Sequence, residues 1–491
     1  MSDLFILHLM IWTVILPFIF GIFSYTLGRY GSLTTMLAAV IILGLTTSLI
    51  GNVYSVGPMR YAIGGWNSPL GIDLYLDGFS ALMLQFSAIV GLAVSIYACG
   101  YFTKEEEIGA FFWPLWLFAW GSLNALFLSA DIFNLYVCLE VMTFAVIGLV
   151  IIKGTVPAVT AALRYIFLSA LGSLSYLFGV ALLYSTYGTL DLTVLASFIV
   201  PELMSMSAIT FITFGLMIKA ALFPLHFWLP PAHANAPTPV SAVLSGLVVM
   251  AAFYLLVRLW FDAFISVINP IHGQFLGMLA IFTIFYGSLQ ALRQSRLKML
   301  IAYSTVAQIG YMFLIFPLVS EHALGEIFAW SGGIYLALSH ACAKAAAFMV
   351  AGSIMYALKH DRIDGLEGLA RRFPIGIFTF SLAGLSLAGL PPSGGFVGKW
   401  LLLKAAMLSG QWWYAVIMIC GSLLTVAYIV LVLEVALRTP IESKNALVVP
   451  KAMQYSALGL SIIAILMGLI ASPTLNIMSA DRSQSNLQGA I

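Results

Sequence analysis

The sequence contains very little charge. Only 8% of its 491 residues are Asp, Glu, Lys or Arg, whereas 62% are hydrophobic, and the mean hydropathy is +1.04. This balance excludes a soluble globular domain, whose surface needs many more charged residues. The net charge of +2 gives no basis for binding nucleic acid. Apolar runs of about 20 residues, the length that crosses a bilayer, recur along the chain. It is therefore predicted to be a polytopic helical membrane protein.

Cysteine is scarce as well. The four cysteines, Cys99, Cys138, Cys342 and Cys420, lie in apolar segments without disulfide or metal spacing, so we expect small core residues and no metal site. The chain has no GxGxxG after a strand, no CxxC pair and no CxxCH. Its seven histidines offer no convincing pair for haem. We therefore expect no cofactor and no electron transfer by this chain itself.

The apolar runs predict an all-α fold with about 14 transmembrane helices. They start near residues 4, 33, 76, 110, 131, 157, 206, 237, 272, 298, 330, 373, 413 and 453. The N-terminal run lacks the basic start of a signal peptide and is expected to be the first span. The longest polar stretches, 52–75 and 359–372, are too short for a soluble domain.

The basic residues predict how the chain crosses the membrane. Fourteen of the 21 Lys and Arg lie in or beside loops that follow odd-numbered spans, and only Arg60, Arg258 and Arg482 lie on the other side. Cytoplasmic loops carry the excess of basic residues. Both termini are therefore expected on the periplasmic or outer face.

Two spans are interrupted next to a lysine. In span 7, Lys219 is followed by a run of prolines: Pro224, Pro230, Pro231, Pro237 and Pro239. In span 12, the break LPPSGG at 390–395 precedes Lys399. Broken membrane helices are tolerated where they line a polar cavity or an ion path.

The two breaks lie five spans apart, as two inverted five-helix repeats would place them. The predicted division gives helices 1–3 to residues 1–109 and the first repeat, with broken helix 7, to 110–262. The second repeat, with broken helix 12, takes 272–437. The last helix and a short tail take 438–491.

Glu140 and Lys219 are the first charges expected inside the membrane. Glu140 is mid-span, where a carboxylate needs a partner or must stay protonated, so it is a candidate proton carrier or one half of a structural ion pair. Lys219 is its natural partner, because opposite charges in a low dielectric hold each other ionised. Without a partner, a buried lysine would lose its proton readily, which suits a relay.

Further titratable residues follow in spans 11 and 12. His340 and Lys344 are four residues apart and share a helix face, so they are candidate relay stations, although a satisfied core histidine is the alternative for His340. Lys399 lies deep beside the second break. Lys404 either extends its charge to the interface or faces a partner subunit. His226, within the interrupted part of span 7, is a secondary candidate.

Five segments carry a family resemblance. In chain order they read DIFNLYVCLE, KAALFPLHFWLPPAHANAPTPVSA, LKMLIAYSTVAQIGYM, HACAKAAAFMVAGS and LAGLPPSGGFVGKW. On these segments, which extend from residue 131 to 400, the chain resembles the antiporter-like proton-translocating subunits shared by respiratory complex I and the Mrp-type multisubunit cation/proton antiporters. Its length looks more like the Mrp D-type subunit, or a complex I M- or N-type subunit, than the longer L- or A-type subunits.

The resemblance implies roles by position. Glu140 and Lys219 match the pair whose association gates proton uptake, His340 and Lys344 match the polar positions of the central axis, and Lys399 matches the exit-side residue of broken span 12. These residues would form a hydrated relay along the membrane midplane. The resemblance also implies other integral membrane subunits as partners, protons and Na⁺ as transported ions, and a multi-pass location in the cell (inner) membrane.

Three positions depart from the family pattern. Met250 stands where the family usually has a central lysine in span 8, Pro231 replaces the Asp of the WLPDAH motif, and Arg296 replaces the Asp before LK. The missing lysine removes a station between Lys219 and Lys399. Either water with His340 and Lys344 bridges the gap, or the channel is impaired or altered in its choice of ion.

Four functions compete. The chain is expected to be a subunit that conducts protons, in exchange for Na⁺ or another monovalent cation, within an Mrp-type complex. The alternatives are a proton-pumping subunit of a complex I-like NADH:quinone oxidoreductase or membrane hydrogenase, a structural subunit with an impaired channel, and a stand-alone transporter of an organic solute. In none of these does the chain itself catalyse a chemical reaction.

Overall fold

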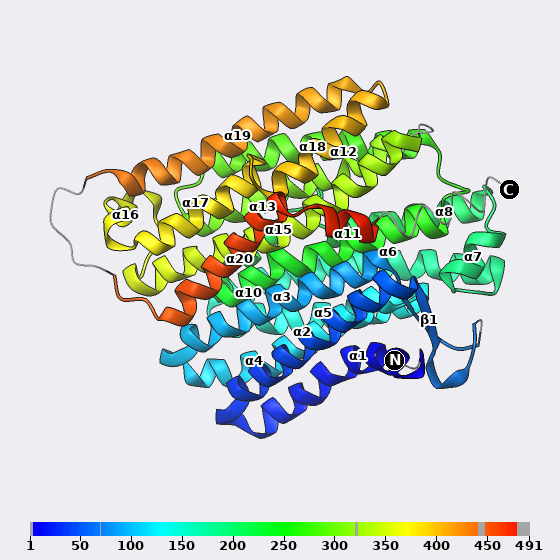
Figure 1. The fold of residues 1–491 in the computed structure, drawn as a ribbon, viewed down its shortest axis with the longest axis horizontal. Coiled ribbons are helices and arrows are strands. Elements are labelled where there is room, and N and C mark those ends of the chain that lie inside the picture. Colours follow the sequence, from blue (N-terminus) through cyan, green and yellow to red (C-terminus); the bar gives the residue numbers. More distant parts are fainter. Residues whose placement is uncertain (1–2, 69, 320–322, 440–446, 479–491) are drawn as a thin grey trace.

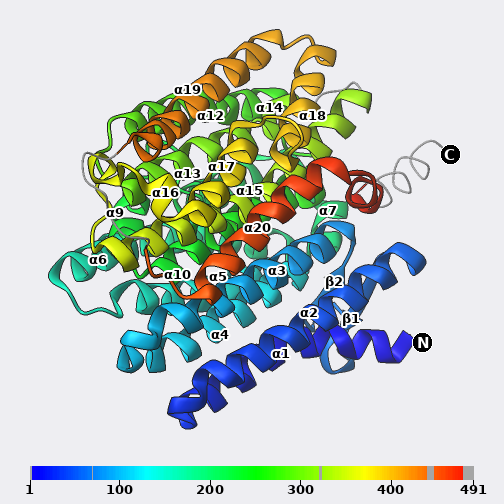
Figure 2. The same cartoon turned by 60° about the vertical axis from the view of Figure 1, so that its left-hand side comes forward.

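The structure is a computed structural model that describes residues 3–68, 70–319, 323–439 and 447–478. Long helices lie roughly side by side and make up nearly all of the described chain (Figures 1 and 2). This arrangement follows from the composition, because a helix satisfies its own backbone hydrogen bonds and can therefore cross a bilayer. The predicted all-α membrane fold is confirmed.

The N-terminal part contains three long helices and a hairpin. The helices are α1 (Asp3–Thr26), α2 (Gly31–Val56) and α3 (Gly78–Tyr101). Between α2 and α3, strands β1 (Met59–Ala62) and β2 (Asp73–Leu76) pair antiparallel, with Met59 opposite Leu76. Short 3₁₀ turns, η1 (Gly28–Tyr30), η2 (Ile63–Gly65) and η3 (Phe102–Lys104), complete this part. The polar stretch 52–75 thus contains the end of α2 followed by a hairpin, which the sequence did not predict.

The first broken helix lies in the next group. This group contains α4 (Glu106–Leu128), α5 (Ile132–Ile151), α6 (Val156–Tyr187), α7 (Leu192–Phe198), α8 (Leu203–Lys219) and α9 (Leu229–Asn235). A continuous helix then follows, made of α10 (Thr238–Val243), the π-helical η4 (Leu244–Val248), α11 (Val249–Arg258) and the π-helical η5 (Leu259–Ala263). The most hydrophobic 18 residues of this helix are 100% buried, so it forms the centre of the molecule.

The second broken helix lies in the last group. Its elements are α12 (Pro270–Leu292), α13 (Leu297–Phe313), α14 (Ile315–Leu318), α15 (Ala323–Leu358), η6 (Ile363–Leu366), α16 (Leu369–Arg372), α17 (Pro374–Ala388), α18 (Gly394–Leu408), α19 (Trp412–Leu437) and α20 (Lys451–Leu469). Helix α15 packs closely against α18, α17 and α20. The helices that carry His340, Lys344 and Lys399 are therefore neighbours.

The helices begin near the predicted positions. Among the described residues, 12 helices are long and apolar enough to cross a membrane, and α8 and α17 are shorter apolar helices. Each of these two is followed by a second segment, α9 or α18, after the predicted break. The number of crossings and the inverted repeats stay predictions.

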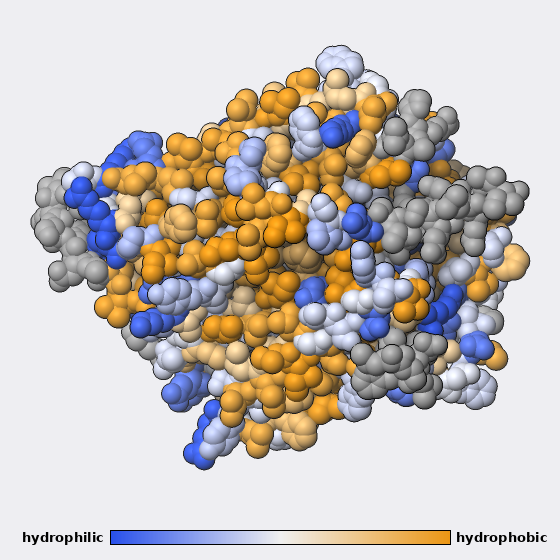
Figure 3. Space-filling model, viewed as in Figure 1, coloured by the Kyte–Doolittle hydropathy of each residue, from blue (hydrophilic) through white to orange (hydrophobic). Residues whose placement is uncertain are grey.

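The surface agrees with a membrane environment. Hydrophobic residues dominate the middle of the face in Figure 3, whereas hydrophilic residues gather toward its left and right ends. The start of α1, the last described segment after α20 (red) and the β1–β2 hairpin lie toward the right of Figure 1, and α16 lies on the left. The two ends of the described chain are therefore on the same side of the bundle.

The cysteines only partly follow the prediction. All four are free; Cys138 and Cys342 are buried and Cys99 is half-buried, but Cys420 is exposed on α19. The expectation that all four are core residues is thus wrong for Cys420. The reason is that a membrane protein can present an apolar surface outward, where a small thiol fits as well as in the core.

Candidate functional site

The first break places Lys219 at the end of a helix. Helix α8 ends at Lys219, and Ala221 two residues later has a positive φ of 56°. The groups that the break frees find partners: the indole Nε1 of Trp228 donates to the carbonyl of Ile218 at 2.9 Å, and the amide of Phe223 donates to Thr283 Oγ1 of α12 at 3.1 Å. These hydrogen bonds stabilise the helix break, because unsatisfied backbone groups are costly in lipid.

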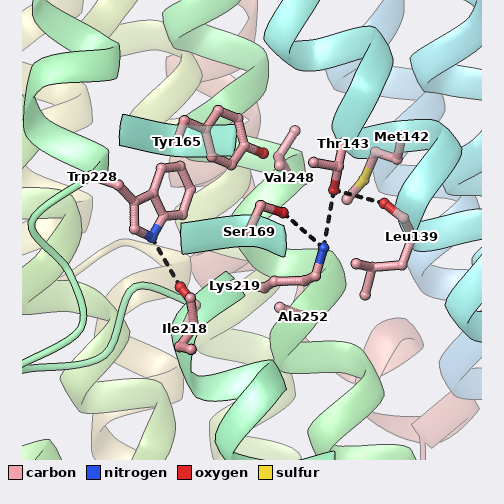
Figure 4. Close-up of a pocket in the computed structure, with 10 residues that line it drawn as sticks. All are labelled: Leu139, Met142, Thr143, Tyr165, Ser169, Ile218, Lys219, Trp228, Val248 and Ala252. Atoms are coloured by element: carbon pink, nitrogen blue, oxygen red, sulfur yellow. Dashed lines mark hydrogen bonds between the residues drawn. The ribbon is translucent and has the colours of Figure 1, made fainter. Parts of the chain in front are cut away.

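Lys219 forms an ion pair with Glu140. Its Nζ lies 2.8 Å from Glu140 Oε1 of α5. It also donates to Ser169 Oγ of α6 at 2.9 Å and to Thr143 Oγ1 of α5 at 3.3 Å, and Figure 4 shows these two hydrogen bonds. Ser173, one turn beyond Ser169, donates a short hydrogen bond to the same Glu140 oxygen. The pairing predicted from the sequence is confirmed, and hydroxyl groups of two helices position both partners.

The two partners differ in their surroundings. The Lys219 side chain is 7% exposed and that of Glu140 is 18% exposed, so the carboxylate lies nearer the edge of the molecule. On the other side of the ammonium is a small cavity of about 10 Å³, lined by Thr143, Ser169, Val248 and Ala252 among others (Figure 4). This is about the minimum volume that a single water molecule needs.

The second break holds Lys399. Helix α17 ends at Ala388, and the capping residue Gly389 has a positive φ of 77°. Ser393 caps α18 by accepting from the amide of Phe396 at 3.2 Å. Lys399 Nζ donates to the carbonyls of Leu387 at 3.0 Å and Ala388 at 3.3 Å. These carbonyls belong to the end of a helix, where the macrodipole favours a cation.

No carboxylate pairs with Lys399 among the described residues. Its remaining contacts are Ser422 Oγ of α19 at 3.2 Å and the ring of Tyr311, whose centroid is 4.0 Å from Nζ. Beside it is a cleft of about 200 Å³, lined otherwise mainly by apolar side chains of α18 and α19. The two broken helices thus hold their lysines in different ways, one with a carboxylate and one with neutral oxygen atoms and a ring.

Lys344 and His340 lie between the two breaks on α15. Lys344 is completely buried; its Nζ donates to the carbonyl of Ile301 at 3.1 Å and makes a short hydrogen bond to Ser304 Oγ. His340 is 2% exposed, and neither ring nitrogen forms a hydrogen bond to the described residues. Its ring interacts electrostatically with both Lys344 and Lys399. The role of His340 as a relay station stays a prediction.

The secondary candidates are less central. His226 lies in the first break, stacked on Phe223 with centroids 5.7 Å apart, and its Nδ1 has no partner among the described residues. Lys404 is half-buried, with its Nζ 5.3 Å from the ring centroid of Phe328 and 5.6 Å from that of Trp400. Rings rather than a carboxylate stabilise this cation.

Met250 is buried in the central helix, with 2% of its surface exposed. It does not line the cavity beside Lys219; Val248 and Ala252 do. The π-helical segment Leu244–Val248 precedes it, and such segments shift the register of side chains around a helix axis. On the α11 side, the ammonium of Lys219 therefore faces apolar side chains.

Two buried residues were missed from the sequence. Lys298 was counted with the loops, but it is 1% exposed and donates to the carbonyl of Ala236 at 2.7 Å. His233 is fully buried, stacks on Phe348, and interacts electrostatically with both Lys298 and Lys344. Their presence in the family segments LKMLIAYS and PPAHANAP was the available signal.

Arg296 and Pro231, the other two positions that depart from the family pattern, each have a simple structural explanation. Arg296, 46% exposed, pairs with Asp361 at 2.9 Å. Pro231 is the third residue of the short helix α9, within the first turn, where a backbone N–H has no partner inside the helix and a proline is tolerated. Among the described residues, no group of three or more His, Cys, Asp and Glu could hold a metal ion.

A helical membrane bundle with two broken helices, each beside a buried lysine, is the architecture of an ion-translocating membrane protein. The family model described as NADH:quinone oxidoreductase/Mrp antiporter, TM matches residues 129–425, and that described as NADH-Ubiquinone oxidoreductase (complex I), chain 5 N-terminus matches residues 61–112. The chain belongs to this family of antiporter-like membrane subunits.

Individual relatives agree with this assignment. The N-type subunit of the NADH-quinone oxidoreductase of Desulforudis audaxviator is 35% identical over 384 residues, which are 77% of this chain and 75% of that protein. The D-type subunit of the Na⁺/H⁺ antiporter of Alkalihalophilus pseudofirmus is 30% identical over 426 residues, or 85% and 84%. A chain of the Mrp complex from Dietzia sp. superposes with a TM-score of 0.88 at 25% identity, covering 98% of this chain and 97% of that one.

Proposed function

We propose that the chain conducts protons along a midplane relay of Glu140, Lys219, His340, Lys344 and Lys399, in exchange for Na⁺ or another monovalent cation, as a subunit of an Mrp-type antiporter complex. The observation that carries the proposal is the Glu140–Lys219 ion pair at the broken helix α8–α9. An intramembrane ion pair at a helix break is costly to build, and such groups mark ion pathways.

The geometry suggests how the pair works. A proton that arrives on Glu140 removes the charge that holds Lys219, and breaking this attraction in a low dielectric changes the energy of the lysine strongly. Ser169 and Thr143 still hold the ammonium, and the small cavity lies on its α11 side. From there the relay continues through His340 and Lys344 to Lys399.

Substitution of the pair tests the relay. Lys219→Ala or Glu140→Ala should abolish transport in membrane vesicles while the complex still assembles. The control is Glu434→Ala, because Glu434 forms an exposed i,i+4 pair with Arg438 at 2.8 Å on α19.

Removing one partner of a buried pair is also destabilising. The double variant Glu140→Gln/Lys219→Met removes both charges and keeps the test valid if a single variant does not assemble. Parental transport by any assembled variant of the pair would refute the relay.

Partner subunits follow from the edge position of Glu140. On α5, the side chains of Phe133, Val137, Val141 and Phe144 are exposed around this partly exposed carboxylate. A charge is costly next to lipid, and the superposed Mrp structure is a multisubunit complex. The chain is therefore one subunit of a membrane assembly, and this face of α5 is proposed to contact a neighbour.

Electron transfer in partner subunits is a second candidate for the driving force, because a relative of the chain is a subunit of an NADH-quinone oxidoreductase. The same relay would serve a proton pump driven by electron transfer in partner subunits. Purification of the chain in mild detergent from its native membrane, followed by mass spectrometry, separates the two. Small hydrophobic partners without flavin or iron–sulfur proteins support the antiporter, and peripheral redox subunits support the pump. Recovery of the chain alone would contradict both.

A further inference from the structure

Helices α8 and α12 leave an apolar groove between them on the side of the bundle. The groove holds a cavity of about 610 Å³, and its walls come mainly from α8, from α12 and from the first break. The two helices make few direct contacts with each other. Phe214 of α8 and Phe275 of α12 line the groove and are exposed, so the groove is open toward the surroundings of the bundle.

The groove follows the first part of each helix. On α8 it extends from Met206 to Met217, about 16 Å at the rise of an α-helix, and on α12 from Ile271 to Leu279, about 12 Å. Both helices begin at the same end of the bundle, because Ser266 in the turn before α12 donates at 3.0 Å to a carbonyl in the loop before α8. Half of the hydrocarbon core of a bilayer is about 15 Å thick. The groove therefore has the depth of one leaflet.

Water is a poor occupant of this groove. A buried water molecule needs about three polar partners. Midway along the wall, the polar side-chain atoms already have partners, since Thr210 donates to the carbonyl of Met206 at 2.8 Å and Thr213 accepts from Trp260 Nε1 at 3.0 Å. A gap without an occupant would lose dispersion contacts along both helices. An apolar molecule therefore fits the groove best.

The size and surroundings of the groove exclude a protein segment. A helix is about 10–12 Å across with its side chains, so 16 Å of helix would need about twice the volume of the cavity. An extended segment would be thin enough, but it would bring unpaired backbone groups into an apolar site inside the membrane. An acyl chain has neither problem.

One hydrogen-bond donor lies at the end of the groove that is nearest the membrane surface. His272, two residues after the cap of α12, lines the groove there. Its Nδ1 accepts from the amide of Asn269 at 3.2 Å, so the proton of the ring is on Nε2. Nε2 can therefore donate to an ester or phosphate oxygen, and the start of a membrane helix is the depth at which lipids carry these groups.

We propose that this groove binds one membrane phospholipid, with one acyl chain between α8 and α12 and an ester or phosphate oxygen at His272. The chain ends beside Pro224 and Leu225 of the first break. A phospholipid matches both the apolar walls and the donor, whereas a pure hydrocarbon would leave the donor unused. The site needs no residue of the proton relay, so it does not depend on the proposed function.

Photo-crosslinking tests the site. The full-length chain, purified with any subunits that accompany it, is placed in vesicles of phosphatidylethanolamine and phosphatidylglycerol. Part of the phosphatidylglycerol carries a diazirine in the middle of one acyl chain, and mass spectrometry locates the adducts. Met217 and Leu276 line the groove but are only 6% and 1% exposed, so lipid outside the groove does not reach them. Adducts on both residues are expected, and adducts on exposed residues alone would overturn the proposal.

Two neighbouring residues of α12 give a matched pair of variants. Leu279→Trp fills the groove, whereas Met278→Trp adds the same ring on an exposed side chain that does not line it. Adducts on Met217 should be lost in the first variant and unchanged in the second. Equal labelling of Met217 in both, or a cross-link from the groove to a peptide of another subunit, would overturn the lipid site. The labelling of the parental protein decides the question even if a variant does not fold.

The polar end of the site has its own test. His272→Leu removes the donor, and phospholipid should be retained about two- to tenfold less tightly during mild delipidation, as expected for the loss of one hydrogen bond. Native mass spectrometry counts the lipid that stays bound, with Met278→Trp as the control. Equal retention by the two variants would overturn the placement of the ester or phosphate oxygen at His272.

Discussion

The buried lysines of this chain differ in what stabilises their charge. Lys219 has a carboxylate at 2.8 Å, Lys399 has carbonyls at a helix end and an aromatic ring, and Lys344 has a hydroxyl and a carbonyl. Lys298 has the carbonyl of Ala236. The only carboxylate in an intramembrane pair with these lysines, among the described residues, is Glu140. A proton that enters at Glu140 would therefore change the charge balance at the Lys219 end of the proposed relay first.

Met250 tests whether the central helix is a gap in the relay. If it is, Met250→Lys should change the rate or the pH dependence of transport, because it adds a titratable amine to the buried central helix. Met250→Leu is the control, since it conserves volume and polarity and should cost less than about 1.5 kcal/mol. Rates measured across the range in which a buried amine titrates decide the question in vesicles. Identical profiles for all three proteins would mean that water already bridges the site.

Much of the site was visible in the sequence because its signals are local. A lone Glu or Lys within an apolar run, or a run of prolines after Lys219, needs no tertiary information to be noticed. The ion pair between Glu140 and Lys219 followed from the cost of burying each charge alone. Lys298 was missed for the opposite reason. It lies at a helix start among basic loop residues, and only the packing of α13 against α9 buries it.

At the scale of helices, the sequence predicted the starts of the spans and both breaks. It did not predict the β1–β2 hairpin, whose strands have only four residues each, or the π-helical segments of the central helix. Both depend on contacts distant in sequence: β2 bridges Ser129, and the central helix is surrounded on all sides.

One buried ion pair joins the start of α3 to the central helix. Asp77 accepts two hydrogen bonds from the guanidinium of Arg258, and Arg258 also pairs with Asp262 at 2.9 Å. Burial opposes ionisation of Asp77, but Arg258 and hydrogen bonds from Ser80 hold the pKa of this carboxyl below its usual value. The folded state therefore favours the ionised form of Asp77.

Asp77→Asn should destabilise the protein by about 3–5 kcal/mol, because it leaves the buried Arg258 charge undercompensated. Glu434→Gln, in a pair whose side chains are 62% and 53% exposed, should cost at most about 1 kcal/mol. Thermal unfolding of the purified complex in detergent, followed by the loss of soluble chain, compares the two. Equal melting temperatures for both variants would show that the Asp77–Arg258 pair does not hold the helices together.

Close packing of α15 against α18 depends on glycine. A Cβ on Gly398 would lie 2.7 Å from the backbone nitrogen of Leu336, whereas a Cβ on Gly44 of α2 would meet nothing within 4 Å. Gly398→Ala should therefore cost about 1–3 kcal/mol. Gly44→Ala should be neutral or gain about 0.5–1 kcal/mol through helix propensity. The melting temperature should fall for Gly398→Ala and should stay the same or rise for Gly44→Ala, and an equal fall in both variants would contradict the packing argument.

At the scale of the whole molecule, the bundle has two polar ends and an apolar side surface. The hairpin and both ends of the described chain lie at one end, and α16 and its neighbouring loops lie at the other (Figure 1). This arrangement agrees with the division of basic residues, since Arg371 and Arg372 belong to α16. Which end faces the cytoplasm is a separate matter, and the positive-inside rule predicts that the α16 end does.

Labelling of single cysteines decides the orientation. In a protein whose four native cysteines are replaced by serine, Asn67→Cys places a thiol on the exposed hairpin loop and Arg371→Cys places one on exposed α16. A membrane-impermeant maleimide should label Asn67→Cys in intact cells from which any outer barrier has been removed. It should label Arg371→Cys only after the membrane is opened. The cysteine-free parent, which should stay unlabelled, and its transport rate serve as controls.

The reverse pattern would put both termini in the cytoplasm and would invert the direction of the relay with respect to the membrane. Glu140 and Lys219 would keep their pairing, but each half of the relay would then open to the opposite compartment.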